Sequence, residues 1–318
     1  MQPPYTITSA ILQLVASISE KIGEINATHL HRPPAELRKS NRIKTIQASL
    51  EIEGNTLSVE QITAIVENKR VLGPQKDILE VKNAIIVYEK LNEFNPNSIE
   101  SLLKAHQLLM KGLIDTSGKL RTRSVGIVKG SDITHLAPPG EMVRSLMKDL
   151  FGYLKSSKDL ALIKSCVFHY ELEFIHPFMD GNGRVGRLWQ TVILKQQYPV
   201  FEYLPIETIV KQKQLQYYEA LSKSDKSGNS TIFIEFMLGI ILESLEELLS
   251  QQNRTFLSSD RIMVFSSIAG KQEFTRKDYL RQFKEISQAT ASRDLKEAVE
   301  RGILKKRGDK SKTKYVFK

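Results

Sequence analysis

The chemistry of this chain is concentrated in one run, His176-Pro177-Phe178-Met179-Asp180-Gly181-Asn182-Gly183-Arg184-Val185-Gly186-Arg187. Gly181 and Gly183 permit backbone conformations in which several N–H groups point the same way and can bind an anion. A helix is expected to begin at Val185, and its dipole would add partial positive charge at the same place. The run is therefore typical of a loop that binds phosphate.

Charged side chains in the same run supply the other groups that phosphate chemistry needs. Arg184 and Arg187 lie three residues apart, so both can reach one anion from the first helical turn. Asp180 offers an oxygen ligand of the kind that Mg²⁺ takes when phosphates supply its other ligands. His176 is the group near the loop that can accept a proton near neutral pH. A glycine turn with solvated arginines is the alternative, but the fixed offsets favour a phosphate site.

The elements around this loop are expected to be mainly helical, because apolar residues recur at helical spacing. The expected helices cover residues 7–22, 35–53, 78–91, 99–110, 141–156, 160–174, 185–196 and 232–249, with a further helix after an N-cap at Ser58. Residues 124–138 instead read as two short strands with a turn between them. Residues 250–259 are polar and are interpreted as a linker.

The run from His176 to Arg187 resembles the signature of the Fic (Fic/DOC) family, in which a His-Pro-Phe-x-Asp/Glu-Gly-Asn-Gly-Arg-x-x-Arg loop joins two helices. The resemblance covers roughly residues 35–245 and implies a mainly α Fic fold with a β-hairpin flap. It also implies a protein adenylyltransferase, which transfers AMP from ATP to a Ser, Thr or Tyr hydroxyl of a target protein and releases pyrophosphate. Removal of AMP and transfer of another phosphate-containing group are alternatives within the family.

The resemblance implies a role for each residue of the loop. His176 would be the catalytic base that takes the proton from the attacking hydroxyl, and Asp180 would hold Mg²⁺ against the α- and β-phosphates. Asn182, with the backbone N–H groups of Gly181 and Gly183, would bind the α-phosphate. The other residues that the resemblance assigns to ATP are Arg184 (β-phosphate), Arg187 (γ-phosphate), Val185, Gly186, Tyr217 and Asp225. A plain core aromatic is the alternative for Tyr217.

The expected hairpin at residues 124–138 gains a role from the same resemblance. In family members such a flap pairs its main chain with a segment of the target protein. Lys129, Gly130 and Ser131 at its tip would border the active site and dock the target. Main-chain pairing is nearly independent of sequence, so the flap does not identify the target. A surface excursion without function is the alternative.

Ser49-Leu50-Glu51-Ile52-Glu53-Gly54 resembles the inhibitory pattern of the family, Ser/Thr-x-x-x-Glu-Gly/Asn. Ser49 and Glu53 share a helix face, and Gly54 can end that helix with Glu53 at its tip. The resemblance places Glu53 against Arg187, where the pair would occupy the position of the γ-phosphate. A solvated glutamate at a helix end is the alternative.

Composition bounds the remaining functions. The chain has 318 residues, 41% of them hydrophobic, which is enough for a packed core in two or three domains. Cys166 is the only cysteine, which excludes an internal disulfide and a multi-thiolate metal site. The first residues lack a signal-peptide pattern and no apolar stretch is long enough to cross a membrane, so a cytoplasmic protein without a membrane partner is expected.

The C-terminal residues carry most of the net charge of +10. Residues 258–318 hold 16 Lys and Arg against 8 Asp and Glu, a net charge of +8. Their pattern predicts a winged helix-turn-helix, with Arg293 on the recognition helix and a basic hairpin at residues 303–317, which suits DNA or a protein partner. The expected domains are residues 1–95, 96–249 and 258–318. A homodimer and a non-catalytic, ATP-sensing DNA-binding regulator remain open alternatives.

Overall fold

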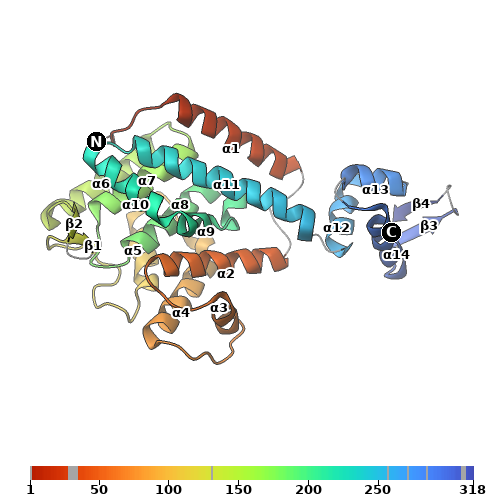
Figure 1. The fold of residues 1–318 in the computed structure, drawn as a ribbon, viewed down its shortest axis with the longest axis horizontal. Coiled ribbons are helices and arrows are strands. Elements are labelled where there is room, and N and C mark those ends of the chain that lie inside the picture. Colours follow the sequence, from red (N-terminus) through yellow and green to blue (C-terminus); the bar gives the residue numbers. More distant parts are fainter. Residues whose placement is uncertain are drawn as a thin grey trace. The chain divides into compact units, whose positions relative to one another are not determined.

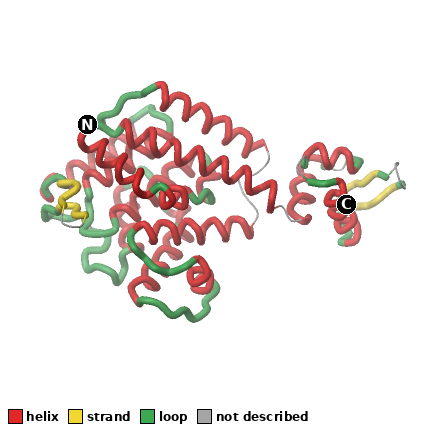
Figure 2. The backbone as a smooth tube through the Cα atoms, in the orientation of Figure 1, coloured by secondary structure: helices red, strands yellow, loops and turns green. Residues whose placement is uncertain are grey.

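The computed structural model describes residues 2–27, 35–129, 132–255, 258–270, 272–283, 286–308 and 313–318. Most of these residues are helical, and the strands form two separate antiparallel pairs (Figure 2). The chain divides into two compact units, Met1–Leu245 and Glu246–Lys318. The N-terminal helices thus share one unit with the loop at residues 176–187. Among the described residues, no helix combines the length and apolarity needed to cross a membrane.

Within the described residues, the first unit contains the helices α1 to α10 and the first part of α11, which surround the loop. The α-helices are α1 (Ser9–Ala27), α2 (Ala35–Ile52), α3 (Val59–Val66), α4 (Gln75–Glu89), α5 (Ile99–Leu109), α6 (Val143–Ser156), α7 (Ala161–Ile175), α8 (Asn182–Gln197), α9 (Ile206–Gln212), α10 (Gln214–Ser227) and α11 (Thr231–Thr255). Short 3-10 helices are η1 (Leu91–Glu93), η2 (Gly140–Met142) and η3 (Pro199–Glu202). The helices predicted from apolar spacing are confirmed, with ends shifted by a few residues.

The centre of this unit is the pair α7 and α8, which pack against each other along their lengths. Both helices are buried on nearly all faces, and Phe168 on α7 and Trp189 on α8 are fully buried. Burial on all sides fixes both helices, so the loop that joins them is held at both ends. α2 packs against α9 and α4 and brings the predicted inhibitory residues to the same region.

The N-terminal segment is tied to α11, and Figure 1 shows α1 and α11 running side by side. The hydroxyl of Thr8 donates to Glu235 Oε1 at 2.6 Å, and the backbone N–H of Ser230 donates to the carbonyl of Pro4 at 3.0 Å. Ser58 is the N-cap of α3 in a capping box with Gln61, as the sequence predicted. These contacts close the helical unit around α7 and α8.

The predicted hairpin is confirmed as β1 (Gly126–Lys129) and β2 (Asp132–Leu136), which pair antiparallel. The register joins Gly126 to Leu136 and Lys129 to Asp132, with an irregularity between Ile127 and Val128. Lys129 therefore ends the first strand at the turn. The other two predicted docking residues, Gly130 and Ser131, lie outside the described residues.

The second unit contains α12 (Ser258–Ala269), α13 (Arg276–Gln282), α14 (Gln288–Glu300) and a hairpin of β3 (Leu304–Arg307) and β4 (Lys314–Phe317). Its core is a cluster of apolar side chains that includes Phe265, Tyr279 and Leu295. Thr275 caps α13, as predicted. The predicted linker at residues 250–259 is wrong over residues 250–255, which belong to α11, and over residues 258–259, which begin α12, while residues 256–257 lie outside the described residues. The order of elements follows the prediction, while a winged-helix assignment stays a prediction.

Candidate active site

The loop begins where α7 ends, at His176. This residue has φ 49° and ψ 60°, a left-handed conformation that is uncommon for a residue with a side chain. Its N–H donates to the carbonyl of Leu172 at 2.9 Å and closes the last turn of α7. Strained backbone of this kind persists only where the surrounding structure holds it.

Arg121 holds this backbone and was missed by the sequence analysis. Its Nε donates to the carbonyl of His176 at 2.6 Å and its Nη2 to the carbonyl of Ile175 at 3.0 Å. The same guanidinium donates to the carbonyls of Arg123 and Pro138, both at 2.7 Å, at the base of the hairpin. Arg121 is only 3% exposed, so one buried guanidinium fixes both the loop entrance and the flap base.

α8 begins at Asn182, three residues before the predicted start at Val185. Gly181 precedes it with φ 85°, and a Cβ there would lie 2.7 Å from the sulfur of Met110, so glycine is required. The side chain of Asn182 accepts from the N–H of Phe178 and donates to its carbonyl, both at 2.9 Å. The Asn182 side chain therefore braces the loop, and its predicted role on the α-phosphate stays a prediction.

A cavity of about 720 Å³ opens at this loop and gathers most of the predicted site residues. Its lining includes His176, Asp180, Gly181, Asn182, Gly183, Arg187, Tyr217, Asp225 and Glu53. Residues from α2, the loop, α8 and α10 thus meet at one place although they are distant in sequence. A cavity of this size with a few convergent charged groups is typical of a small-molecule site.

Arg187 is held by both predicted inhibitory residues. Its Nη2 lies 2.8 Å from Glu53 Oε1 and donates to the carbonyl of Ser49 at 2.9 Å, while its Nε donates to the Ser49 hydroxyl at 3.1 Å. Glu53 and the Ser49 carbonyl therefore share Nη2, and the Ser49 hydroxyl accepts from Nε. Burial disfavours the charged form, but the neighbouring Glu53 carboxylate raises the pKa of Arg187 above its usual value.

The Glu53 carboxylate also lies directly over the start of α8. A Cβ on Gly183 would come within 2.5 Å of Glu53 Oε1 and 3.0 Å of Arg187 Nη1. Only glycine leaves room for a carboxylate at that position. The carboxylate therefore occupies space beside the backbone that an anion bound at this helix N-terminus would use.

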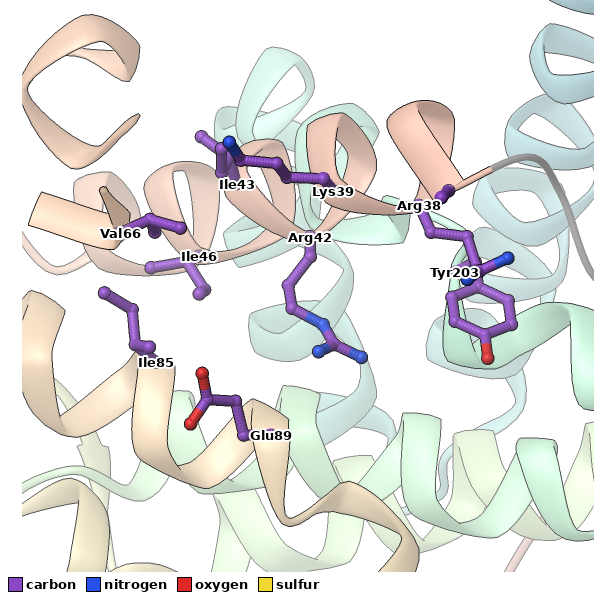
Figure 3. A pocket seen from close by; sticks show the side chains of 10 residues that line it. Arg38, Lys39, Arg42, Ile43, Ile46, Val66, Ile85, Glu89 and Tyr203 are labelled. Atoms are coloured by element: carbon purple, nitrogen blue, oxygen red, sulfur yellow. The ribbon is translucent and has the colours of Figure 1, made fainter. Parts of the chain in front are cut away.

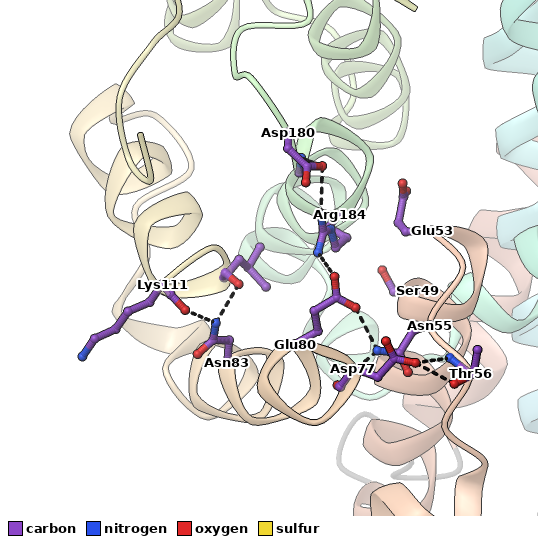
Figure 4. A network of polar contacts seen from close by, with 12 residues as sticks. Ser49, Glu53, Asn55, Thr56, Asp77, Glu80, Asn83, Lys111, Asp180 and Arg184 are labelled. Carbon is purple, nitrogen blue, oxygen red and sulfur yellow. Dashed lines mark hydrogen bonds and ion pairs between the residues drawn. The ribbon is translucent and has the colours of Figure 1, made fainter. Parts of the chain in front are cut away.

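Arg184 and Arg187 contact different carboxylates, and the prediction that both can reach one anion stays a prediction. Its Nη1 bonds to Glu80 Oε1 at 2.9 Å and its Nη2 to Asp180 Oδ1 at 3.0 Å (Figure 4). The two arginines therefore pair with carboxylates on different helices. The sequence analysis missed Glu80 because it lies 104 residues from Arg184, and nothing in the residues around it indicates that it pairs with an arginine.

Two of the predicted nucleotide-binding residues face away from the cavity. Val185 is fully buried in the core, and Gly186 packs against α7, where a Cβ would lie 3.2 Å from both Glu173 and His169. Neither residue is among those that line the cavity, and nor is Arg184. Val185 and Gly186 therefore pack α8 into the core, and their predicted part in nucleotide binding stays a prediction.

Tyr217 lines the cavity from α10 and is also part of the core. Its hydroxyl lies 3.0 Å from His169 Nε2, and His169 Nδ1 lies 2.8 Å from Gln190 Oε1. Burial lowers the pKa of His169 to about 3 and raises that of Tyr217. Asp225 accepts from the hydroxyl of Tyr170 at 3.0 Å. Tyr217 is therefore both a buried aromatic of the core and part of the cavity wall.

His106 contacts the loop at Phe178 and Asp180, and the sequence analysis assigned it no role. Its ring stacks on Phe178 with centroids 3.6 Å apart, and its Nε2 lies 2.9 Å from the carbonyl of Asp180. Because Nδ1 accepts from the N–H of Gly118, Nε2 is the protonated nitrogen of a neutral ring. Burial lowers the pKa of His106 to about 4, which keeps the ring in this neutral form.

The predicted Mg²⁺ ligand has the chemistry that the ion requires. Asp180 is half exposed at the cavity, and one of its oxygens accepts from Arg184. Among the described residues no group of three His, Cys, Asp or Glu side chains converges on one point. A single carboxylate fits Mg²⁺ only if phosphate oxygens and water complete the coordination.

A second cavity, of about 370 Å³, lies along the first half of α2 (Figure 3). Arg38 and Arg42 line it from α2, Glu89 from α4, and Tyr203 from the segment before α9. The guanidinium carbon of Arg38 lies 5.6 Å from the centre of the Tyr203 ring. The predicted site residues all lie elsewhere, so this cavity is separate from the loop.

Comparisons with solved structures find the same fold. A Fic family protein from Desulfovibrio desulfuricans G20 is 40% identical, with a TM-score of 0.78, and the match covers 100% of this chain and 98% of that chain. Fic-1 from C. elegans has a TM-score of 0.64 at 21% identity and covers 77% of this chain and 73% of its own. The second likeness concerns the fold alone.

Curated relatives match over part of their length. Protein adenylyltransferase fic-1 of Caenorhabditis briggsae is 33% identical over 184 residues, which are 54% of this chain and 34% of that protein. Protein adenylyltransferase Fic of Nematostella vectensis is 29% identical over 243 residues, 71% of this chain and 54% of that protein. The chain spans about a third to about a half of these relatives. The Fic/DOC family model matches residues 96–194, the match to the Desulfovibrio protein runs the length of both chains, and this chain belongs to the Fic/DOC family.

Proposed function

We propose that this protein is a protein adenylyltransferase that transfers AMP from ATP to a Ser, Thr or Tyr hydroxyl of a target protein. The observation that carries the proposal is that His176, Asp180 and Arg187 line one cavity at the N-terminus of α8. The relatives named protein adenylyltransferase support the same activity. Transfer of AMP needs an anion site, a base and a path for the target, and the cavity supplies the first two.

In the proposed reaction the hydroxyl oxygen of the target attacks the α-phosphorus of ATP. The bond from the α-phosphorus to the bridging oxygen breaks, and pyrophosphate leaves with the electron pair. His176 takes the proton from the hydroxyl as the new bond forms, a contribution typically worth about 10²–10⁴ in rate. Arg121 fixes the backbone of His176, so the imidazole starts from a defined position.

In this proposal the N-terminus of α8 binds the triphosphate. The free N–H groups that follow Gly181 and the helix dipole attract the α-phosphate, and Arg187 is positioned for the γ-phosphate. Tyr217 and Asp225 form the part of the cavity wall left for the nucleoside. Asp180 would hold Mg²⁺ beside the phosphates, where the ion neutralises charge on the leaving group.

We further propose that the protein is inhibited by its own α2. Glu53 takes the guanidinium that the γ-phosphate needs, and its carboxylate crowds Gly183. ATP that enters beside this ion pair would have its phosphates out of line for attack. Because α2 belongs to the same compact unit as the loop, inhibition acts within one chain.

The proposal is tested with two variants and ATP labelled at the α-phosphate. Glu53→Gly should raise labelling of proteins in a lysate with Mg²⁺ present, because Arg187 is released. His176→Ala should abolish labelling, by about 10² or more, because the base is lost. The double variant is the control, since it binds ATP without the inhibitory carboxylate and lacks the base. If Glu53→Gly labels no protein at all, the transfer activity is refuted.

Removal of AMP from a modified protein is the second candidate, and the position of Glu53 favours it. Its carboxylate is 31% exposed at the cavity, where it could orient a water molecule toward a bound phosphodiester. Mass spectrometry of a target incubated with the wild-type chain distinguishes the outcomes by a gain of AMP, a gain of another phosphate-containing group or a loss of AMP. An ATP-sensing regulator without catalysis would give no mass change, and His176→Ala would leave its properties unaltered.

We propose one partner for the hairpin beside the loop and another for the C-terminal unit. The target would pair with the hairpin at residues 126–136, next to the loop. The C-terminal unit would bind DNA or a protein through its exposed basic strand β3, whose Lys305, Lys306 and Arg307 all face solvent. A homodimer remains a proposal that gel filtration with light scattering would test.

A further inference from the structure

A buried carboxylate on α4 joins the loop to the turn that carries Glu53. Glu80 is only 6% exposed, and each of its two oxygens has a different partner. Oε1 accepts from Arg184 Nη1 at 2.9 Å, and Oε2 accepts from Asn55 Nδ2 at 2.8 Å (Figure 4). Asn55 is two residues after Glu53 in the sequence. One side chain therefore touches both the loop and the end of the inhibitory helix.

The turn after α2 depends on these contacts for its position. Asn55 Nδ2 also donates to the carbonyl of Asp77 at 3.1 Å, and its Oδ1 accepts from the N–H of Leu57. The N–H and hydroxyl of Thr56 both donate to Asp77 Oδ2, at 2.8 and 2.6 Å. The turn is thus fastened to α4 by Asn55 and Thr56, while the Glu53 carboxylate is paired with Arg187 on α8.

We propose that Glu80 is a positioning residue that couples Arg184 to the inhibitory turn. It holds Arg184 through one oxygen and the Glu53 turn through the other. A change at either partner alters the geometry that Glu80 can offer to the other partner. This inference rests on the proposed function, because it assigns the coupling to nucleotide binding at the loop on one side and to inhibition on the other.

The charges explain why a carboxylate is needed at this position. Arg184 is 5% exposed and has two carboxylate partners, of which Asp180 is half exposed and Glu80 is the buried one. Asn55 presents an N–H group to Glu80, so this position must accept on both sides. Glutamine has one acceptor and one donor and can satisfy only one of the two contacts. The charge-assisted bond to Arg184 is the stronger, so glutamine at this position would release Asn55.

Hydrogen exchange of the backbone amides at residues 53–57 tests the coupling without reference to activity. Glu80→Gln and Asn55→Ala should each raise exchange in this turn roughly tenfold, which corresponds to about 1.4 kcal/mol. The double variant should exchange no faster than Asn55→Ala alone, because the Asn55–Glu80 bond that Glu80→Gln removes is among the three bonds that Asn55→Ala removes. Arg184→Lys should also raise exchange of the turn, although Arg184 makes no direct contact with it in the described structure.

Asn83→Ala is the matched control. Asn83 lies on the same helix, is 4% exposed, and donates to the carbonyls of Leu109 and Lys111 at 3.1 and 2.8 Å. Its loss should weaken the fold without raising exchange at residues 53–57 selectively. If Asn83→Ala changes that exchange as much as Asn55→Ala does, the turn responds to stability alone and the coupling is refuted. Unchanged exchange in both Glu80→Gln and Asn55→Ala refutes it as well.

AMP transfer supplies a second readout that separates this inference from the proposed function. In the chain with Glu53, Asn55→Ala and Glu80→Gln should raise labelling roughly tenfold, in line with a loosened turn. In the Glu53→Gly chain Asn55→Ala should change labelling less than about threefold, because no inhibition remains to release. If Glu53→Gly labels nothing, the proposed function fails, while the exchange experiment still decides the coupling. Equal effects of Asn55→Ala in both chains would overturn the coupling and leave the transferase intact.

Discussion

Glu207 offers a quantitative test of the packing against α2, the helix that precedes Glu53. It lies on α9, which packs against α2, and it is only 2% exposed. The Tyr88 hydroxyl donates to its Oε1 at 3.3 Å, while Oε2 has no partner among the described residues. Burial raises the pKa of Glu207 to about 7 from an ordinary value of 4.5. The ionised form is therefore disfavoured in the folded protein.

The sign of the pH effect follows from this direction. A carboxyl group with a raised pKa binds its proton more tightly when folded, so its stabilising effect is complete below pH 4.5. That effect is lost as the pH rises through about 7. The difference between these values corresponds to about 3 kcal/mol of unfolding free energy. Glu207→Gln keeps an acceptor for Tyr88 and carries no charge, so it should be more stable than the wild type at pH 8 by about this amount and similar at pH 5.

Denaturation with urea, followed by the fluorescence of Trp189, measures this difference. Trp189 is the single tryptophan of the chain and is fully buried on α8, so its signal reports the unit that contains Glu207. Groups that titrate in both proteins cancel in the comparison. Glu219→Gln is the control, because Lys223 holds the pKa of that exposed carboxyl below its usual value and no gain at pH 8 is expected. A stability difference that is the same at pH 5 and pH 8 would refute the reasoning.

Two further predictions concern Arg121 and the C-terminal unit. Arg121→Lys keeps the charge but loses the fork of N–H donors that reaches four carbonyls. In the Glu53→Gly chain we expect this change to lower AMP transfer roughly tenfold or more, while ATP affinity, measured by titration calorimetry, stays within about threefold. Equal losses of transfer and of affinity would contradict a role of Arg121 in placing His176. If the C-terminal unit binds DNA through phosphates, Lys305→Ala should lower the slope of log affinity against log salt by about 0.9 in fluorescence anisotropy with duplex DNA. An absence of binding at low salt would exclude DNA as the partner.

The local features of the site could be predicted because each depends on residues that lie close together in the sequence. The loop from His176 to Arg187 contains its own glycines, base and carboxylate, and the pattern that ends α2 after Glu53 is equally short. Hydrophobic spacing also predicted the helices, since burial of one face imposes a regular period. Errors occurred at boundaries: α8 begins before Val185, and α11 runs on to Thr255 through polar residues that can be helical as well as extended.

The partners of buried charges could not be predicted, because they come from distant elements. Arg121, Glu80 and His106 each act on the loop from 55 to 104 residues away. In the sequence they are ordinary members of amphipathic or polar segments, and their roles follow only from how the helices pack. The spacing of Arg184 and Arg187 suggested one shared anion, but the positions of α2 and α4 divide the two guanidinium groups between different carboxylates.

This division has a consequence for how inhibition could be relieved. Glu80 lies in the middle of α4 and is nearly fully buried, and Arg184 is held by Asp180 in addition to Glu80. Glu53 lies at the end of α2, is 31% exposed, and touches Arg187 through one oxygen. Arg187 itself is only 3% exposed, so loss of Glu53 would leave a buried guanidinium that needs another anion. Relief of the proposed inhibition therefore requires movement of the Glu53 turn, and because Glu80 joins that turn to Arg184 through Asn55, the same movement would change the contacts of Glu80 as well.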